Sequence, residues 1–313
     1  MTTREPTARS PDETAVETSA RSFRVNAAEF PAPRITSGLH VVATPIGNLG
    51  DVTLRALETL AAADVIACED TRVTRILTDR YRIRTPLISY NDHNAAERRP
   101  HLLALLDEGK AVVLVSDAGT PLVSDPGYKL VAEALASGHR VVPIPGASAM
   151  LAALVASGLP SDAFLFAGFL APKSEARRRR IEELARVPAT LIFYESPHRL
   201  ADCLADLAAV LGETRPAVIA RELTKHFEEV VRGDLATLAR DFAARTVKGE
   251  IVVLVGPPGE EATSEIDVDA MLRAALARQA PGKAVAEVAR LTGADRKALY
   301  ERAMALKDET RGR

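Results

Sequence analysis

Short apolar runs alternate with amphipathic segments along the chain from residue 38 onward. Such runs, rich in Val, Ile, Leu and Ala, predict buried β-strands. The predicted strands are Leu39–Ala43, Val65–Cys68, Ala111–Val115, Val141–Ile144, Phe164–Phe169, Thr190–Tyr194, Ala217–Ala220 and Ile251–Val255. Between many of them apolar residues recur with a helical period, as at Leu54–Ala62, Lys129–Ala136 and Leu200–Leu211. Strands that alternate with helices predict an α/β fold with mostly parallel strands.

Changes in composition divide the chain into parts. Residues 1–36 are rich in Thr, Ser, Pro, Ala and charge and have little periodicity, which predicts a disordered N-terminal tail. The Gly- and Pro-containing stretch Val155–Phe164 marks the expected boundary between one α/β domain at 37–157 and a second at 158–258. A linker rich in Pro, Gly and Glu then leads into purely helical sequence.

Three helical segments form the expected C-terminal module at 265–313. They are Asp269–Arg278, Lys283–Leu291 and Asp295–Lys307, and Asp295 is the expected N-cap of the last one. The last two segments and their short turn are compatible with a helix-turn-helix. A small bundle used for packing or dimerisation explains the same pattern equally well.

Composition excludes several classes of protein. The chain has 313 residues, 47% of them hydrophobic, but no apolar run approaches the roughly 18 residues of a membrane helix. The formal net charge of −2 means that any contact with nucleic acid has to use local basic patches. Cys68 and Cys203 form no C-x-x-C pair and the six histidines are scattered, so we expect no metal site. The N-terminal tail has no signal-peptide core and carries acidic residues, which transit peptides avoid, so we expect a cytoplasmic protein.

Candidate chemistry collects in the loops that follow the predicted strands, where open α/β sheets bind ligands. Six such loops are dense in Gly, Pro, acids and bases, which predicts a large site spread over both domains. Their sequences are TPIGN, EDTR, SDAGTPLVSDPG, PGASA, YESPHR and RELTK. The stretch Ser116–Gly127 contains two Gly and two Pro, which fix an irregular backbone near a strand end. No phosphate-binding G-x-x-x-x-G-K-[ST] motif occurs.

The basic residues are local as well. Lys173–Val187 is predicted to be a helix that opens with four consecutive arginines. A charge run of this kind is more often a solvated helix face than a binding site. Arg199, Arg221 and Lys225 also follow strand ends, however, and such a basic rim suits RNA phosphates.

Several long motifs occur in a fixed order: VATPIGNLGDVTLRALE, ACEDTRVTRILT, SYNDHN, VSDAGTPLVSDPGY, PGASA, ASGLPSDAFLFAGFL, FYESPHRL, RELTKHFEE and KGEIVVLV. Over residues 38–256 they closely resemble the bacterial 16S ribosomal RNA (cytidine-2′-O-)-methyltransferases of the tetrapyrrole-methylase-like group. The resemblance implies two α/β domains with a cofactor cleft between them, plus a small C-terminal helical module. It also implies S-adenosylmethionine as methyl donor, no metal, and a homodimer that acts on 16S rRNA or on the assembled small ribosomal subunit.

The resemblance also implies site residues. The implied cofactor-binding residues are Pro45, Gly47, Ala118, Gly119, Thr120, Val123, Ser148, Ala149, Tyr194, Glu195, Leu223, Glu250 and Ile251. Here SDAGTP replaces the Gly-Gly-Asp-Pro pattern of porphyrinoid-methylating relatives and matches the RNA-methylating branch. We assign RNA binding to Arg72, Arg177, Arg178, Arg199, Arg221 and Lys225.

The implied reaction is attack of a ribose 2′-oxygen on the sulfonium methyl group, with a positioned base for the hydroxyl proton. The acid–base candidates are Glu69, Asp70, His93, Asp117, Glu195, Glu222 and Lys225. We favour Asp117 and Glu69. Inter-loop salt bridges are the structural alternative for Glu69, Arg72, Arg221 and Glu222.

Two other functions remain open from the sequence. A porphyrinoid methyltransferase would use the same fold, although its substrate calls for a broad apolar trough instead of a basic rim. A non-enzymatic RNA-binding factor in ribosome assembly would use the C-terminal helices. The dense strand-end loops argue against a pure binding protein.

Overall fold

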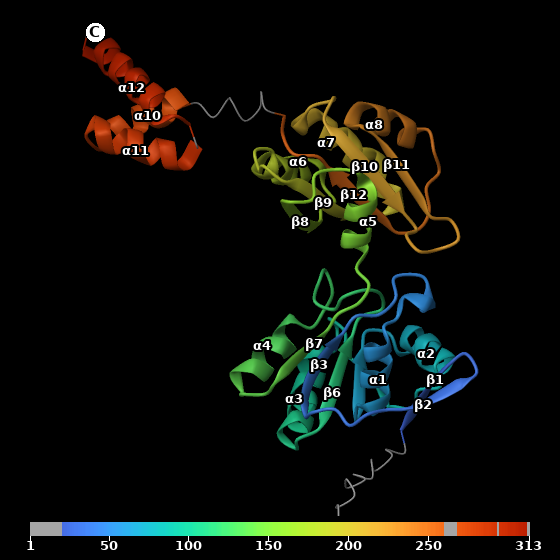
Figure 1. Ribbon diagram of the computed structural model, residues 1–313. Helices are drawn as coiled ribbons and strands as arrows, with labels where there is room; N and C mark the ends of the chain where they lie inside the picture. The colour runs from blue at the N-terminus through green and yellow to red at the C-terminus, as the bar shows by residue number, and fades with distance from the viewer. Residues whose placement is uncertain (1–20, 260–267, 293, 312–313) are drawn as a thin grey trace, which may run out of the picture. The chain divides into compact units, whose positions relative to one another are not determined.

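The computed structural model describes residues 21–259, 268–292 and 294–311 (Figure 1). The chain forms two compact units, and the helical C-terminal segment counts with the second. The first unit is Met1–Ala152 with Leu223–His226, and the second is Ala153–Glu222 with Phe227–Arg313. No helix within these described ranges is long and apolar enough to cross a membrane.

The first unit contains a five-stranded sheet with the order β5-β4-β6-β3-β7, in which every pair of neighbours is parallel. Its strands are β3 (Gly38–Val42), β4 (Val65–Cys68), β5 (Leu87–Ser89), β6 (Ala111–Val115) and β7 (Val141–Ile144). The helices are α1 (Leu54–Ala62), α2 (Thr71–Arg80), α3 (Ala95–Asp107) and α4 (Tyr128–Ala136), with a short 3-10 turn η1 (Leu49–Asp51). Helix α5 (Ala149–Ser157) begins in this unit and ends in the second. All carboxyl ends of the strands therefore share one edge of the sheet.

Both faces of this sheet are buried. Along β6, Val113 and Val115 pack into the apolar cluster under α1 and α2, whereas Val112 and Leu114 pack into the cluster under α3 and α4. Side chains alternate between the faces of a strand, so a strand buried on both faces has to be apolar throughout. This is why the apolar runs predict four of the five strands in this sheet, although the three-residue β5 was not predicted.

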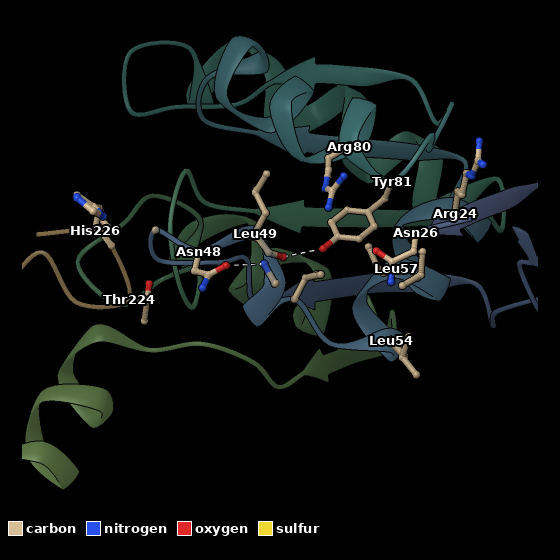
Figure 2. A pocket seen from close by; sticks show the side chains of 15 residues that line it. Arg24, Asn26, Asn48, Leu49, Leu54, Leu57, Arg80, Tyr81, Thr224 and His226 are labelled. Carbon is tan, nitrogen blue, oxygen red and sulfur yellow. Dashed lines mark hydrogen bonds between the residues drawn. The ribbon is translucent and has the colours of Figure 1, made fainter. Parts of the chain in front are cut away.

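A β-hairpin precedes the first sheet and corrects the prediction of a disordered tail over residues 1–36. Its strands β1 (Ser22–Val25) and β2 (Ala28–Pro31) pair antiparallel. Phe23 is buried in the same apolar cluster as α1, and the Arg24 N–H donates to the Tyr81 carbonyl at 2.8 Å. The Tyr81 hydroxyl in turn donates to the Leu49 carbonyl at 2.8 Å (Figure 2). Residues 1–20 of the predicted tail lie outside the described residues.

The second unit contains a mixed sheet with the order β11-β10-β12-β9-β8. Its strands are β8 (Phe164–Phe169), β9 (Thr190–Glu195), β10 (Pro216–Arg221), β11 (Glu229–Asp234) and β12 (Ile251–Val255). Only β8 and β9 are parallel, and the other three pairs are antiparallel. The prediction of mostly parallel strands is thus wrong for this sheet. A short connection, 222–228, joins β10 directly to β11, and only antiparallel neighbours permit such a link.

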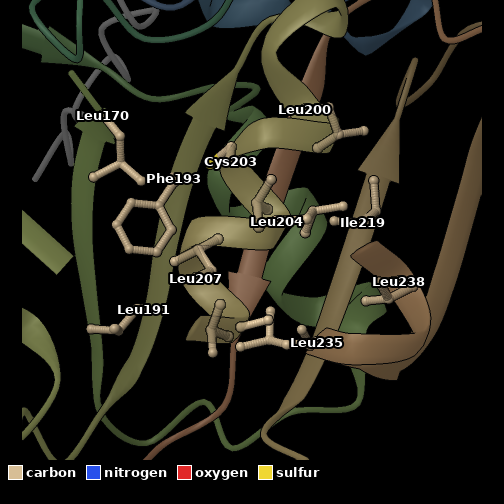
Figure 3. Packing of buried hydrophobic residues seen from close by; sticks show 14 of the residues in the cluster. Leu170, Leu191, Phe193, Leu200, Cys203, Leu204, Leu207, Ile219, Leu235 and Leu238 are labelled. Atoms are coloured by element: carbon tan, nitrogen blue, oxygen red, sulfur yellow. The ribbon is translucent and has the colours of Figure 1, made fainter. Parts of the chain in front are cut away.

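Three helices cover one face of the second sheet. They are α6 (Ser174–Leu184), α7 (Leu200–Leu211) and α8 (Leu235–Ala243), and a 3-10 turn η2 (Pro197–Arg199) precedes α7. Leu204 and Leu207 of α7 lie against Phe193 of β9 and Ile219 of β10 in this core (Figure 3). The core fixes the strand ends from which the second group of site loops begins.

The C-terminal helices α10 (Val268–Leu276), α11 (Pro281–Thr292) and α12 (Arg296–Arg311) have an apolar cluster of their own, which includes Leu272, Val288 and Leu299. The carboxylate of Asp295 accepts the N–H groups of Lys297 and Ala298 at 3.0 and 2.9 Å. This contact confirms Asp295 as the residue that caps the last helix.

Candidate active site

Two strand-end loops of the first unit are joined by backbone pairing. The Thr44 N–H donates to the Gly119 carbonyl at 2.8 Å, and the Gly119 N–H donates to the Thr44 carbonyl at 3.0 Å. The Thr44 hydroxyl also donates to the Ser116 carbonyl at 3.2 Å. The loop after β3, which carries Pro45 and Gly47, is therefore fixed against the loop after β6.

A third strand-end loop, the one after β7, meets the same loop. The Thr120 hydroxyl donates to the Ala147 carbonyl at 3.2 Å. Ser148 and Ala149 follow at the start of α5, where the Ser148 carbonyl accepts the Ala152 N–H at 2.9 Å. The structure thus brings together most of the predicted first-unit cofactor residues: Pro45, Gly47, Ala118, Gly119, Thr120, Ser148 and Ala149.

The loop after β6 has the irregular backbone that its Gly and Pro content predicts. Leu122 and Ser124 have φ angles of 70° and 65°, and Gly119 has a φ of 80°. Side-chain-bearing residues in this left-handed region cost about 1–2 kcal/mol each. Strain of this kind persists only where the surroundings impose it, and it clusters at ligand sites. Predicted cofactor residue Val123 lies half-buried between the two strained positions.

The two favoured acid–base residues lie at the same sheet edge. An Asp117 carboxylate oxygen accepts the Asp70 N–H at 2.9 Å, and Glu69 is the residue before Asp70. Burial raises the pKa of Asp117 above the ordinary aspartate value. Burial also raises the pKa of Glu69, and the negative charges of Asp117 and Asp125 raise it further. A carboxyl with a raised pKa exchanges a proton near neutral pH more readily than an exposed one.

Asp125 was not among the predicted site residues, although it belongs to the same loop as Asp117. Burial raises its pKa, and a hydrogen bond from the buried Ser116 opposes the shift. The sequence feature that could have identified Asp125 is its position eight residues after Asp117, in the strand-end loop richest in Gly, Pro and polar residues.

The strand register of the second unit brings a second group of predicted residues to one edge. Ile251, at the start of β12, pairs with Glu195 at the end of β9 and with Arg221 at the end of β10. Tyr194, Glu195, Glu250 and Ile251 therefore lie together at that edge. Leu223 belongs to the first unit.

The side chain of Glu195 is engaged within the second unit. It is fully buried, forms an ion pair with Arg199 at 3.3 Å and accepts the Ser196 N–H at 2.8 Å. Arg199 also donates to the Leu170 carbonyl at 2.6 Å. This carboxylate fixes the loop after β9 and is poorly placed to act as a base.

The position of Arg177 corrects the prediction that it binds RNA. Only 3% of this residue is exposed, and its guanidinium lies 2.7 Å from the carboxylate of Asp206. Ser174 donates to the same carboxylate, and the half-exposed Arg178 pairs with it as well. Four consecutive arginines cover every side of a helical turn, so one of them necessarily faces the protein interior.

The predicted salt bridges have different partners. Arg72 pairs with Asp70 at 2.6 Å, and its side chain is 90% exposed. Arg221 pairs with Glu229 at 3.1 Å. The Lys225 side chain lies directly over Gly47, where any Cβ would collide with it. Within the described residues, no three His, Cys, Asp or Glu side chains are grouped to hold a metal ion.

The chain is similar to known methylases over most of its length. Residues 38–239 match the family described as tetrapyrrole (corrin/porphyrin) methylases, and residues 262–307 match the RsmI C-terminal HTH domain. The ribosomal RNA small subunit methyltransferase I of Mesorhizobium japonicum is 58% identical over 285 residues, covering 91% of this chain and 97% of the relative. Its namesake from Xylella fastidiosa is 48% identical, covering 84% of this chain and 97% of the relative.

Solved structures share the fold. The uroporphyrin-III C-methyltransferase of Thermus thermophilus, complexed with S-adenosylhomocysteine, matches with a TM-score of 0.50 at 21% identity, covering 69% of this chain and 96% of that one. The chain therefore belongs to the tetrapyrrole (corrin/porphyrin) methylases and, within them, to the ribosomal RNA small subunit methyltransferase I family.

Proposed function

We propose that this protein transfers a methyl group from S-adenosylmethionine to the ribose 2′-oxygen of a decoding-centre cytidine in 16S rRNA. The observation that carries the proposal is the pair of half-buried carboxyls with raised pKa values, Asp117 and Glu69, at the strained loop after β6. Relatives that align with this chain over nearly their whole length are named for methylation of small-subunit ribosomal RNA. The proposed setting is the cytoplasm, and the proposed active form is a homodimer.

The residues present suit a cofactor that ends in an amino acid. In the loop after β6, Ala118 is exposed and Thr120 is half-buried, whereas Gly119 is buried and its backbone is paired with Thr44. No phosphate-binding motif occurs there. Pro45, Gly47, Val123, Ser148, Ala149 and Leu223 complete the proposed cofactor residues of the first unit, and Tyr194, Glu195, Glu250 and Ile251 are those of the second. When bound, S-adenosylmethionine supplies an electrophilic methyl group, so the reaction calls for no metal.

The protein's own part in the reaction is to orient the ribose and to receive its proton. Asp117 is held by the Asp70 N–H, which directs one carboxylate oxygen and leaves the other for the substrate. We assign Asp117 as the base and Glu69 as the residue that shares the proton, because the negative charge of Asp117 raises the pKa of Glu69. A positioned base contributes roughly 10²–10⁴-fold to the rate.

Replacement of Asp117 by Asn tests this role, because the amide keeps the acceptor for Asp70 but cannot take a proton. We expect kcat to fall by roughly 10²–10⁴-fold while cofactor affinity is retained. The exposed Asp162→Asn is the matched control. Near-normal turnover of the Asp117 variant at saturating substrate would exclude Asp117 as the base.

The proposed RNA-contacting residues are Arg72, Arg178, Arg199, Arg221 and Lys225. The ion pairs of Arg199 and Arg221 favour a structural role for those two. Arg72 is the best placed of the five, since its side chain is almost fully exposed beside Asp70 and Asp117.

The deciding experiment is methyl transfer from labelled cofactor to small ribosomal subunits that lack the modification, with free rRNA run alongside. We expect labelled 2′-O-methylcytidine when the nucleosides are identified by mass spectrometry. Cofactor binding without transfer to either RNA would favour a porphyrinoid substrate. Absence of both cofactor binding and transfer would leave an RNA-binding assembly factor.

A further inference from the structure

The first unit contains a hollow of about 920 Å³ that the proposed catalytic residues do not line (Figure 2). Four segments form it: the turn of the β1–β2 hairpin, the loop after β3 with the start of α1, the end of α2, and Thr224–His226. We call it the cationic hollow, because all its charged lining residues are basic. Its volume is at the upper end of the roughly 300–1,000 Å³ that ligand sites occupy.

The cationic hollow gathers positive charge from distant parts of the sequence. Arg24, Arg80 and Lys225 line it together with His226, and the lining residues, all of them described, include no Asp or Glu. Basic side chains that converge on one hollow create a positive potential, which attracts an anionic partner. The protein carries a net charge of −2, so this local excess is not a consequence of overall composition.

Arg24 supplies a second, independent observation. Its Nε is buried and has no hydrogen-bond partner among the described residues. A buried donor without a partner is costly, and native structures usually satisfy such groups. A turn of the Arg24 side chain toward the hollow would let an oxygen of a bound phosphate satisfy this donor.

The residues of the cationic hollow are held in place before any ligand binds. The Arg24 N–H donates to the Tyr81 carbonyl and the Tyr81 hydroxyl donates to the Leu49 carbonyl, both at 2.8 Å. These bonds connect the hairpin, the end of α2 and the loop after β3. A preorganised set of donors loses little entropy when it binds.

The arrangement of polar and apolar groups resembles that of a nucleic-acid strand. Figure 2 shows His226 toward one end of the hollow and Arg24 toward the other, with Leu49, Arg80 and Tyr81 between them. Leu54, which is 62% exposed, adds apolar surface to the lining. Cations separated by apolar surface can contact phosphates on both sides of a base or ribose.

We propose that the cationic hollow binds the phosphate backbone of the RNA substrate on one side of the nucleotide that is methylated. This inference rests on the proposed function and assigns a role to the hairpin. The hairpin precedes residues 38–239, which match the methylase family, so Arg24 lies outside the family's matched segment. Gly47 lines the hollow and is also a proposed cofactor residue, which places the phosphates beside the reaction site.

The test uses the full-length double variant Arg24→Gln, Arg80→Gln. The matched control is Arg84→Gln, Arg98→Gln, which removes the same charge from two exposed arginines of the same unit that do not line the hollow. Binding to small subunits that lack the modification is measured over a range of salt concentrations. Each lost phosphate contact should reduce the slope of log K against log salt by about 0.7–0.9. We expect affinity at low salt to fall on the order of tenfold.

The control should keep the wild-type slope, and all proteins should keep the same unfolding transition and cofactor affinity. Equal slopes for the two double variants would overturn the proposal. The proposal would also be overturned if millimolar inorganic phosphate binds the hollow while the hollow variant keeps the wild-type salt slope for RNA binding. That result would indicate a small-anion site.

Methyl transfer by the wild-type protein separates this inference from the proposed function. Transfer with equal slopes would refute the cationic hollow as an RNA site and leave the proposed function intact. Slopes that depend on the hollow, without any methyl transfer, would support the RNA site and refute the proposed reaction.

Discussion

Asp117 combines a proposed catalytic role with a cost in stability. Its folded-state pKa is raised above the ordinary value of 3.8, and burial is the main cause. Ionisation of Asp117 therefore destabilises the folded protein. The effect is complete at a pH above the folded-state pKa and absent at a pH below the unfolded-state pKa. Groups shifted in this way are concentrated at active sites, where the protonation equilibrium is part of the chemistry.

Because the pKa of Asp117 is raised in the folded state, the stability that this residue costs depends on pH. We expect Asp117→Asn to melt at a higher temperature than the wild type at pH 7.5, because the variant has no charge to desolvate. The difference should shrink as pH falls through the folded pKa toward the ordinary aspartate range. Thermal unfolding between pH 7.5 and 4 measures it, with Asp162→Asn as control. Identical melting temperatures at every pH would contradict a desolvated carboxylate at position 117.

At the scale of single elements, α6 is held to the second unit by a buried ion pair. We expect Arg177→Leu to lower the free energy of unfolding by about 3 kcal/mol, because Asp206 then loses its buried partner. The value lies at the low end of the range because Ser174 and Arg178 still contact Asp206. Urea denaturation measures the loss, and the exposed Arg179→Leu is the control. If the two variants are equally stable, Arg177 is not a structural residue.

The N-terminal hairpin is a second element whose packing can be tested. Phe23 is 3% exposed in the first core, whereas Phe30, stacked on it at 5.5 Å, is 42% exposed. We expect Phe23→Ala to cost about 3 kcal/mol and Phe30→Ala no more than about 1.5 kcal/mol, by denaturant unfolding. A chain disordered at these positions would show no change for either variant.

Most of the strands predicted from the apolar pattern match the structure to the residue, both where the strand is buried throughout, as in β6 and β12, and where it is partly exposed, as in β8. β4, β6, β7, β8 and β12 have the predicted bounds, while β5 and β11 were not predicted. β5 has only three residues, and the side chains of β11 are mostly half-buried, so neither forms a continuous apolar run. The hairpin was missed because its turn uses Asn26 at a φ of 53°, and a single Asn gives little signal in polar sequence.

Strand direction and side-chain partners were harder to predict than strand position. The alternation of strands and helices suggested mostly parallel pairing, yet the short link after β10 reverses the chain. Motif order placed the loops of the site correctly at strand ends. It did not indicate that Arg72 pairs with Asp70 or that Arg177 is buried, because those contacts depend on side-chain direction.

At the scale of the whole molecule, charge is distributed unevenly within a nearly neutral protein. The first unit holds a group of carboxyls with raised pKa values, namely Glu69, Asp117 and Asp125, as well as the cationic hollow. A unit that presents both a group of carboxyls and a group of cations favours a ligand that interacts with both. An RNA nucleotide offers phosphates for the cations and a hydroxyl proton for the carboxyls.

The C-terminal helices have a core of their own, which makes their contribution separable. We expect the two sheet-containing units to unfold at the same denaturant concentration in a chain ending at Pro258 as in the full-length chain. If the module at 265–313 contacts RNA, the KM for small subunits should rise on the order of tenfold. Steady-state methyl transfer to subunits measures this effect. A truncated protein that methylates as well as the full chain would show that the module has no part in substrate binding.

The left-handed residues of the loop after β6 have a consequence for how the protein would evolve. Ser124 is exposed at a φ of 65°, where glycine would relieve about 1–2 kcal/mol of strain and cost about 0.4–1 kcal/mol through the unfolded chain. Selection for heat resistance alone would therefore enrich glycine at position 124. Leu122 is different, because its side chain also packs against the core. A lineage that kept serine at position 124 would show that the rigidity of this loop is itself under selection.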